Sequence, residues 1–340
     1  MTTATVAEPV ERRYDFVLLF DVADGNPNGD PDAGNLPRID PQSLQGLVTD
    51  GCLKRKIRNA VSVLADGRSG CELYFQTQDA VYEKRVLNLI HQSAWDSLGL
   101  KASSSDDRDA EPEPAEKKTR GKKSKNTDRG DVDKVAQTRA WMCQNFYDVR
   151  AFGAVMTTGV NCGQVRGPVQ LTFARSVDPI VPLEFSITRK SVTTEREATE
   201  QINKTDPDTG KRFGTITGTM GRKNTIPYGL YRCSGFVNPY LAKDTRFSAE
   251  DLELLWQSLK GLIWEIDRSA SRGLMATRGL YVFEHSSMLG NAPAHELFDL
   301  IQVKPLGADV APRSFADYLP NVSILVDRVP PGVTLRRLVG

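Results

Sequence analysis

The chain has 340 residues, of which 39% are hydrophobic, and it carries a formal net charge of +1. That length can hold one large domain or two modest ones, and the apolar fraction is sufficient for a hydrophobic core. The nearly balanced charge excludes nucleic-acid binding through overall charge, so any basic surface must be local. No apolar run is long enough to cross a membrane.

The cysteines and histidines narrow the possible chemistry. The five cysteines, Cys52, Cys71, Cys143, Cys162 and Cys233, are odd in number and contain no CxxC pair. This predicts free thiols in a reducing compartment and argues against a zinc finger. The histidines His91, His285 and His295 are few and scattered, which suits His-centred catalysis poorly. The first thirteen residues are polar and do not resemble a signal peptide, so we expect a cytoplasmic protein with no metal and no cofactor.

The first predicted strand runs from Tyr14 to Val22. Apolar residues occupy every second position from Tyr14, and Val17 and Leu19 lie between them, which predicts a strand covered on both faces. A long loop follows, from Ala23 to Val48, in which Asn-Pro, Asn-Gly and Asp-Pro steps predict a series of tight turns. Loops of this length are usually functional or disordered, and we favour a functional loop over a plain surface loop.

A basic amphipathic helix is predicted after this loop. Thr49 can cap it, and Val48 can pack on Leu53. Its apolar stripe comprises Leu53, Ile57, Ala60, Val61 and Leu64, and its cations are Lys54, Arg55, Lys56 and Arg58. Lys54, Arg55 and Arg58 should lie together beside the stripe, with Lys56 on its other flank. Such cations repel one another unless an anion lies alongside, so we favour polyanion binding over a solvated helix face.

The next part of the chain changes composition abruptly. We predict a short strand over Leu73–Gln76, a helix across residues 80–98 and another from Val132 to Phe146. Between these helices, residues 101–130 have alanine as their only apolar type, with acidic charges followed by basic ones. Such a segment buries too little apolar surface to offset its ordering entropy, which predicts a disordered insertion. We expect it to act as a solvated tether, with contact to nucleic acid as the alternative.

The central part predicts strands and a projecting hairpin. Residues Asp148–Val155 read as a strand before a Gly-rich turn, and Val169, Leu171 and Phe173 alternate in the next strand. Residues 188–227 are rich in Thr, Gly and charge, which predicts a β-hairpin. A second helix with a clear N-cap begins after Ser248, with Asp251 completing a capping box, and a final strand is predicted over Leu280–Glu284.

Without its insertions, the predicted order is strand, helix, strands, hairpin, helix, strand. This is a split β-α-β arrangement, so we assign the chain to the α+β class with a decorated ferredoxin-like or RNA-recognition-motif fold.

The candidate binding residues are basic or amide side chains, and no catalytic group accompanies them. They are Asn28, Arg38, Lys54, Arg55, Lys56, Arg58, Gln164, Arg166, Arg268 and Arg272. Such a set can hold a sugar-phosphate backbone without reading or altering it. The alternative is an RNA endonuclease that uses Asp24, Asp30 or Asp32, although acidic residues in turns more often bond their own backbone. An ordinary duplex-DNA-binding protein is disfavoured because its recognition motifs are missing.

Several long motifs resemble one family. They are NPNGDPDAGNLPR at 26–38, LVTDGCLKRKIRN at 47–59, DVRAFGAV at 148–155, GQVRGPVQ at 163–170 and SRGLMATRGLYVFEH at 271–285. The chain resembles the backbone subunit of type I-C Cascade, which is the seventh-numbered family of CRISPR-associated proteins. The resemblance covers most of residues 14–290.

The resemblance implies a fold with three named parts. Residues 14–78, 148–187 and 228–290 would form an RNA-recognition-motif palm. Residues 79–147 would form a helical finger insertion and 188–227 a thumb hairpin, with 291–340 as a C-terminal extension. In the thumb, Met220 and Lys223 would lie near the strand that returns to the palm.

The resemblance also implies a function. The protein would be a non-catalytic scaffold whose copies line up along the crRNA spacer and display its bases for pairing with target DNA. Its partners would be crRNA, further copies of itself and other Cascade subunits. A guide must work for any spacer, so such a protein should hold phosphates and sugars and leave base edges free.

Overall fold

A computed structural model describes residues 8–76, 86–100, 129–189, 191, 194–195, 219–307 and 310–340. Its centre is an antiparallel sheet in the strand order β14-β11-β1-β10-β8-β4, and β7 and β9 also pair with β10. The strands are β1 (Tyr14–Gly25), β4 (Gln45–Val48), β7 (Val169–Leu171), β8 (Ala174–Pro179), β9 (Leu183–Arg189), β10 (Thr219–Val237), β11 (Leu274–His285) and β14 (Val333–Val339). The predicted first strand is confirmed as the central β1, which pairs with β10 and β11.

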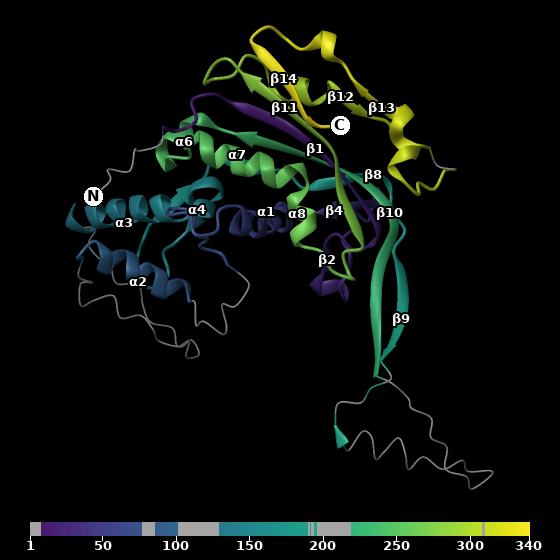
Figure 1. Cartoon of the computed structure of the whole chain (residues 1–340), viewed down its shortest axis with the longest axis horizontal. Helices are drawn as coiled ribbons and strands as arrows, with labels where there is room; N and C mark the ends of the chain where they lie inside the picture. Colours follow the sequence, from purple (N-terminus) through teal and green to yellow (C-terminus); the bar gives the residue numbers. More distant parts are fainter. Residues whose placement is uncertain are drawn as a thin grey trace, which may run out of the picture.

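Helices cover one face of the sheet (Figure 1). They are α1 (Asp50–Leu64), α6 (Pro239–Thr245), α7 (Ala249–Gln257) and α8 (Ile263–Ile266), with a π-helical turn at Ser258–Leu262 between the last two. Phe16, Leu18 and Phe20 of β1 belong to the core under these helices. Both predicted helix starts are confirmed: Thr49 accepts a hydrogen bond from the Cys52 N–H, and Ser248 with Asp251 forms a capping box.

The C-terminal segment covers the opposite face, where Val17 and Leu19 of β1 are buried. It contains α9 (Ala294–Phe298), β12 (Ile301–Val303), β13 (Val322–Ile324), β14 and the 3-10 turns Phe315–Asn321 and Val326–Arg328. The prediction that the last strand of the sheet ends near Glu284 was wrong. β14 pairs with β11 and adds a further strand at the edge of the sheet, and its Val333 belongs to the same buried cluster as Val17 and Leu19.

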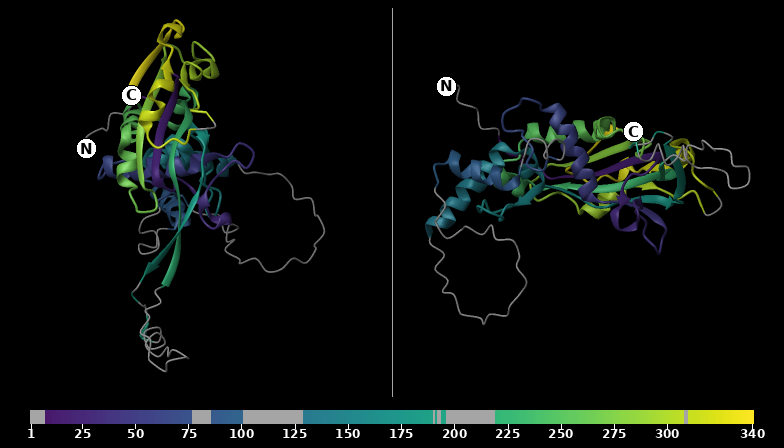
Figure 2. Two further views of the ribbon diagram at one scale, coloured as in Figure 1. Left: turned by 90° about the vertical axis from the view of Figure 1, so that its right-hand side faces the viewer. Right: turned by 90° about the horizontal axis from the view of Figure 1, so that it is seen from below.

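A second hydrophobic cluster lies at one end of the sheet, around α2 (Leu87–Ser97), α3 (Arg129–Asn145) and α4 (Tyr147–Phe152) (Figures 1 and 2). The strand predicted over Asp148–Val155 was wrong: α4 occupies most of it, and only β5 (Gly153–Val155) is extended, paired with β6 (Gln164–Arg166). The strand predicted at Leu73–Gln76 was also wrong. The N–H groups of Tyr74 and Phe75 donate to the Asp148 carboxylate instead of to a neighbouring strand.

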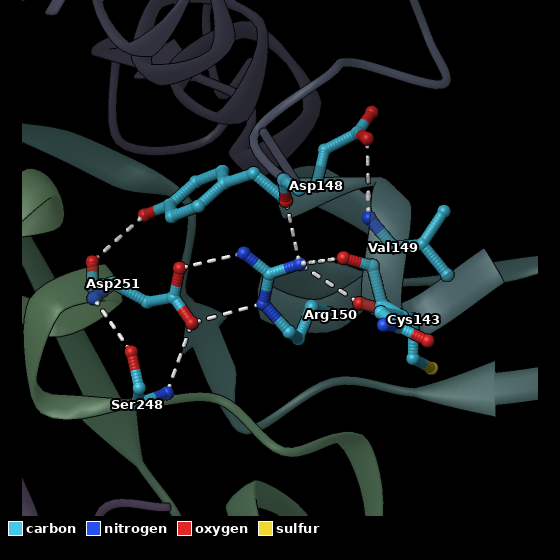
Figure 3. Close-up of polar contacts among 9 residues, drawn as sticks. Cys143, Asp148, Val149, Arg150, Ser248 and Asp251 are labelled. Carbon is cyan, nitrogen blue, oxygen red and sulfur yellow. Dashed lines mark hydrogen bonds and ion pairs between the residues drawn. The ribbon is translucent and has the colours of Figure 1, made fainter. Parts of the chain in front are cut away.

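Arg150 of α4 joins this cluster to the main core (Figure 3). Its guanidinium makes two bonds to Asp251, at 2.9 and 2.7 Å, and it donates to the backbone carbonyls of Gly70, Cys143 and Gln144. Asp251 at the same time accepts the N–H of Ser248. Both charged side chains are buried, and their partners come from four segments of the chain.

A long hairpin projects away from the sheet, formed by β9 and the first half of β10 (Figures 1 and 2). The predicted hairpin is confirmed where it is described, but its paired strands begin at Leu183, and residues 196–218 lie outside the described residues. The predicted disordered insertion at 101–130 lies outside them as far as residue 128, and residues 129–130 begin α3. None of the helices in the described ranges has the length and apolarity needed to cross a membrane.

Candidate nucleic-acid interface

The loop between β1 and α1 is ordered by its own polar side chains. It contains β2 (Gly29–Asp30), a 3-10 turn at Pro31–Ala33 and β3 (Leu36–Pro37) before β4. Asn28 accepts hydrogen bonds from both the N–H and the hydroxyl of Thr49, each at 3.0 Å. The loop is therefore joined to the start of α1 by the hydrogen bonds between Asn28 and Thr49.

One of the three loop carboxylates that could serve an endonuclease, Asp30, has a structural role. Asp30 caps the 3-10 turn by accepting the Asp32 N–H at 3.2 Å, and its other oxygen pairs with Arg38 at 3.4 Å. Asp24 and Asp32 are exposed. Within the described residues, no group of three or more His, Cys, Asp or Glu side chains is arranged to hold a metal ion.

The cations of α1 do not form the uncompensated cluster that the sequence predicted. Lys54 pairs with Asp50 at 3.0 Å, and the buried Lys56 pairs with Asp267. Arg58 donates to Asp148 at 2.8 Å. Three of the four cations are therefore neutralised within the protein, Lys54 by a carboxylate of the same helix and Lys56 and Arg58 by carboxylates of distant segments.

Lys56 differs most from its predicted place on the flank of the helix, since it is part of the protein interior. Its side chain is 2% exposed, and its ammonium lies 5.6 Å from the centre of the Trp264 ring. Burial lowers the pKa of Lys56 and raises the pKa of the neighbouring Cys52 thiol. Lys56 therefore ties α1 to the end of α8, and its charge is directed at Asp267.

Arg272 and Arg268 have different surroundings although they lie close in sequence. Arg272 donates to the backbone carbonyls of Asn26 and Pro27, at 3.1 and 3.2 Å, and lies 3.5 Å from Asp267. It thus holds the loop against the beginning of β11. Arg268 is more exposed and makes two bonds to Glu265, three residues earlier.

These elements surround a polar cavity of about 380 Å³ at the start of α1. Four of the predicted binding residues line it, namely Asn28, Arg55, Lys56 and Arg272. Arg55 is the exposed member of this group, and it has no ion pair with a carboxylate of the described residues. The first turn of α1, represented by Thr49, Gly51 and Cys52, forms another wall. A helix N-terminus beside an exposed guanidinium is suited to an anion such as a phosphate.

The remaining predicted residues lie elsewhere. Gln164 and Arg166 are exposed on β6, at the end of the sheet that carries the second cluster. Met220 is 72% exposed on β10 within the projecting hairpin, and Lys223 is half-buried there, opposite Phe185 of β9. The fold therefore gathers only part of the predicted set in one cavity and distributes the rest along the molecule.

The chain is similar to proteins of one known family over most of its length. The profile of the family described as CRISPR-associated protein Cas7 matches residues 12–324. The chain belongs to the Cas7 family. The resemblance to the seventh-numbered family of CRISPR-associated proteins is thus confirmed, and its type I-C form stays a prediction.

A curated Cas7 relative, CRISPR-associated protein Cas7 of Haloferax volcanii, is 26% identical over 252 residues. The match includes 73% of this chain and spans 64% of the length of that relative. Among solved structures, a chain of a "CRISPR RNA-guided surveillance complex, pre-nicking" is similar with a TM-score of 0.45 and 13% identity, over 80% of this chain and 78% of that one. A chain of a "CRISPR RNA-guided surveillance complex" is similar with a TM-score of 0.39 and 12% identity, over 80% and 68% of the two chains.

The cavity at the start of α1 is also lined by residues that the sequence analysis did not predict as binding residues. They are Asn26, Gly29, Asn35, Thr49, Gly51, Cys52, Asp267 and Ser271. Asn26 and Asn35 belong to the loop already predicted to be functional, so the loop itself was a usable signal. No sequence signal pointed to Asp267, because 211 residues separate it from Lys56.

Proposed function

We propose that this protein is a crRNA-binding backbone subunit of type I-C Cascade. Copies of the chain would assemble along the guide spacer, together with other Cascade subunits, and present its bases for pairing with target DNA. The observation that carries the proposal is the polar cavity where the exposed Arg55 meets the N-terminus of α1 in a Cas7-family chain. This arrangement can hold a phosphate while leaving the bases outside.

The sheet supports an RNA-recognition-motif palm within this proposal. The strands β11, β1, β10 and β8 are adjacent in that order, and a helix follows both β1 and β10 in the sequence. This is the strand order of a split β-α-β fold. We assign residues 14–78, 148–187 and 228–290 to the palm, 79–147 to the finger, 188–227 to the thumb and 291–340 to a C-terminal extension.

The contacts of each cation suggest a division of roles. Arg55 is the main phosphate contact, with Asn28, Lys56 and Arg272 at the walls of the same cavity. Lys56 is neutralised there by Asp267, while Lys54 and Arg58 lie outside the lining and pair with Asp50 and Asp148. Arg166 and Lys223, on the β6 strand and the thumb, extend the path toward neighbouring copies, where Met220 offers an exposed apolar side chain.

The proposal is tested by RNA binding of the full chain with Arg55→Ala and Arg68→Ala. Arg68 is also exposed but follows the opposite end of α1, so the two variants lose the same charge at different places. Arg55→Ala should weaken binding to RNAs of unrelated sequence by the same factor. It should also reduce the magnitude of the salt slope by about 0.7 for each phosphate that Arg55 neutralises. Arg68→Ala should change neither quantity.

The RNA itself provides the second measurement. After incubation with the protein and Mg²⁺, it should remain intact, and the protein should form filaments or larger complexes on it. A loss of affinity that depends strongly on the RNA sequence would contradict the backbone-holding role. Cleavage that disappears in an Asp30→Ala variant would contradict the non-catalytic role.

A further inference from the structure

Asn26 has an unusual place in the cavity at the start of α1. It lines that cavity, yet the residue is only 3% exposed. Its backbone N–H donates to the Ser271 carbonyl at 2.7 Å, and its own carbonyl accepts from Arg272 at 3.1 Å. Its side-chain nitrogen donates to the Asn35 carbonyl at 2.8 Å. The side-chain oxygen Oδ1 is buried and accepts no hydrogen bond from the described residues.

The orientation of the amide follows from its neighbours. If the oxygen and nitrogen were exchanged, an acceptor would face the Asn35 carbonyl, which is itself an acceptor. The bond to Asn35 therefore requires that the nitrogen points to that carbonyl and leaves Oδ1 as the free group. An acceptor that is buried without a donor is costly, and such groups in native proteins call for an explanation.

Two neighbouring acceptors of the cavity are engaged. The Asn28 side-chain oxygen receives two bonds from Thr49, and Oδ2 of Asp267 is paired with Lys56 and Arg272. Among the described lining residues, Asn26 is the one whose side-chain oxygen is both buried and without a donor. A strand held beside this wall must bring that donor with it.

The backbone of a nucleic acid offers few donors. Phosphate oxygens are acceptors only, and a deoxyribose within a chain carries no hydroxyl. A ribose does carry one, the 2′-hydroxyl, and this group lets a protein tell RNA from DNA. Base edges also carry donors, but under the proposed function they stay free for pairing.

We propose that Asn26 Oδ1 accepts a hydrogen bond from a ribose 2′-hydroxyl, so that this cavity selects RNA over DNA. The inference rests on the proposed function and adds the chemical class of the strand that the site accepts. Arg55 and the start of α1 hold the phosphate, while Asn26 distinguishes ribose from deoxyribose. Oδ1 is covered from bulk water, so the cavity wall must shift slightly as the sugar enters.

The experiment compares three short oligonucleotides of one sequence on the full chain. They are RNA, RNA with 2′-fluoro sugars and DNA. The 2′-fluoro sugar keeps the ribose-like pucker but cannot donate, so it separates the loss of one hydrogen bond from a change in strand shape. The wild-type protein should bind RNA roughly threefold to tenfold more tightly than 2′-fluoro RNA, as expected for one neutral hydrogen bond.

Asn26→Ala should bind RNA and 2′-fluoro RNA with equal affinity. Asn321→Ala is the matched control, because its side-chain nitrogen also donates to backbone carbonyls but lies in the C-terminal segment. It should keep the wild-type preference. Arg55→Ala should weaken binding of all three strands by one factor and leave the preference unchanged.

Equal binding of RNA and 2′-fluoro RNA by the wild-type chain would overturn this inference and leave the proposed function standing. A preference that survives in Asn26→Ala would overturn it as well. Failure of the wild-type chain to bind any RNA would overturn the proposed function together with the inference. The comparison of ligands on the wild-type chain does not depend on whether Asn26→Ala folds.

Discussion

The Arg58 guanidinium lies 5.0 Å from the centre of the Phe75 ring and 5.4 Å from that of Phe152, and it donates to the buried Asp148. In the sequence it is one of four cations within five positions of α1, but in the fold it stabilises the segment before α2. Asp148 also accepts the N–H groups of Tyr74 and Phe75. For a single charged side chain, its partner within the protein decides whether it is available to a ligand.

The pair of Arg150 and Asp251 gives a stability prediction. Asp251→Asn removes the charge from a buried pair and leaves the Arg150 guanidinium without its counter-ion. Breaking a buried pair in this way costs about 3–5 kcal/mol. Urea denaturation of the variant, followed by circular dichroism, should show a fall in the free energy of unfolding of this size.

Ser248→Ala is the control for that measurement. Asp251 also belongs to the capping box of α7, and Ser248→Ala disrupts the cap while keeping the ion pair. Loss of such a cap costs about 1 kcal/mol. If Asp251→Asn destabilised the protein no more than Ser248→Ala, the buried pair would not be the important contact.

β10 is the element that joins the projecting hairpin to the core. It runs continuously over Thr219–Val237, so its first half pairs with β9 and its second half with β1. In the second half, Gly235 lies directly opposite Phe16, and the phenyl ring of Phe16 covers the glycine. A Cβ at Gly235 would lie 2.1 Å from the Phe16 Cζ atom, which is a clash in a fully buried site.

Gly235→Ala should therefore destabilise the protein. Excess volume in a packed core costs about 1–3 kcal/mol, since the ring must leave its position. The matched variant is Gly221→Ala on the same strand, where the nearest atom to a new Cβ is an Ile187 side-chain carbon at 3.3 Å. The thermal midpoint should fall for Gly235→Ala and stay near the wild-type value for Gly221→Ala; equal midpoints would refute the packing argument.

In the molecule as a whole, the C-terminal segment completes the fold. It covers the second face of β1 and adds β14 to the sheet (Figure 1). Two hydrogen bonds to the buried Asp178 carboxylate hold it there: the Tyr318 hydroxyl donates to Asp178 at 2.5 Å, and Asp178 also accepts the Leu306 N–H. Burial raises the pKa of Tyr318, so its hydroxyl stays protonated as the donor.

Tyr318→Phe should test how far this segment supports the rest of the protein. The variant leaves a buried carboxylate with one donor fewer, which costs about 1–3 kcal/mol. Tyr240→Phe is the control, because Tyr240 is 54% exposed. Urea unfolding should show a lower midpoint for Tyr318→Phe alone. An unchanged midpoint would mean that the hydrogen bond between Tyr318 and Asp178 does not contribute to the stability of the protein.

Two of the wrong strand predictions, at Asp148–Val155 and Leu73–Gln76, share one cause. Asp148–Val155 has the alternation of a strand, but α4 forms because the buried side chains of Asp148 and Arg150 find partners at Arg58 and Asp251 in that geometry. Leu73–Gln76 has the composition of a strand, yet its N–H groups are taken by Asp148. In both cases a contact between distant segments outweighed the local pattern.

Local patterns in the chain were enough to predict the central strand, the two capped helices, the existence of the hairpin and the family of this protein. These depend on periodicity, caps and motifs, which are local in the chain. The folded chain was needed to show that Lys56 and Arg58 face carboxylates 211 and 90 residues away, and that Asn26 lines a cavity with an unpaired oxygen. Charge compensation and burial are properties of groups brought together by folding, so the availability of a side chain to a ligand cannot be read from its neighbours in sequence.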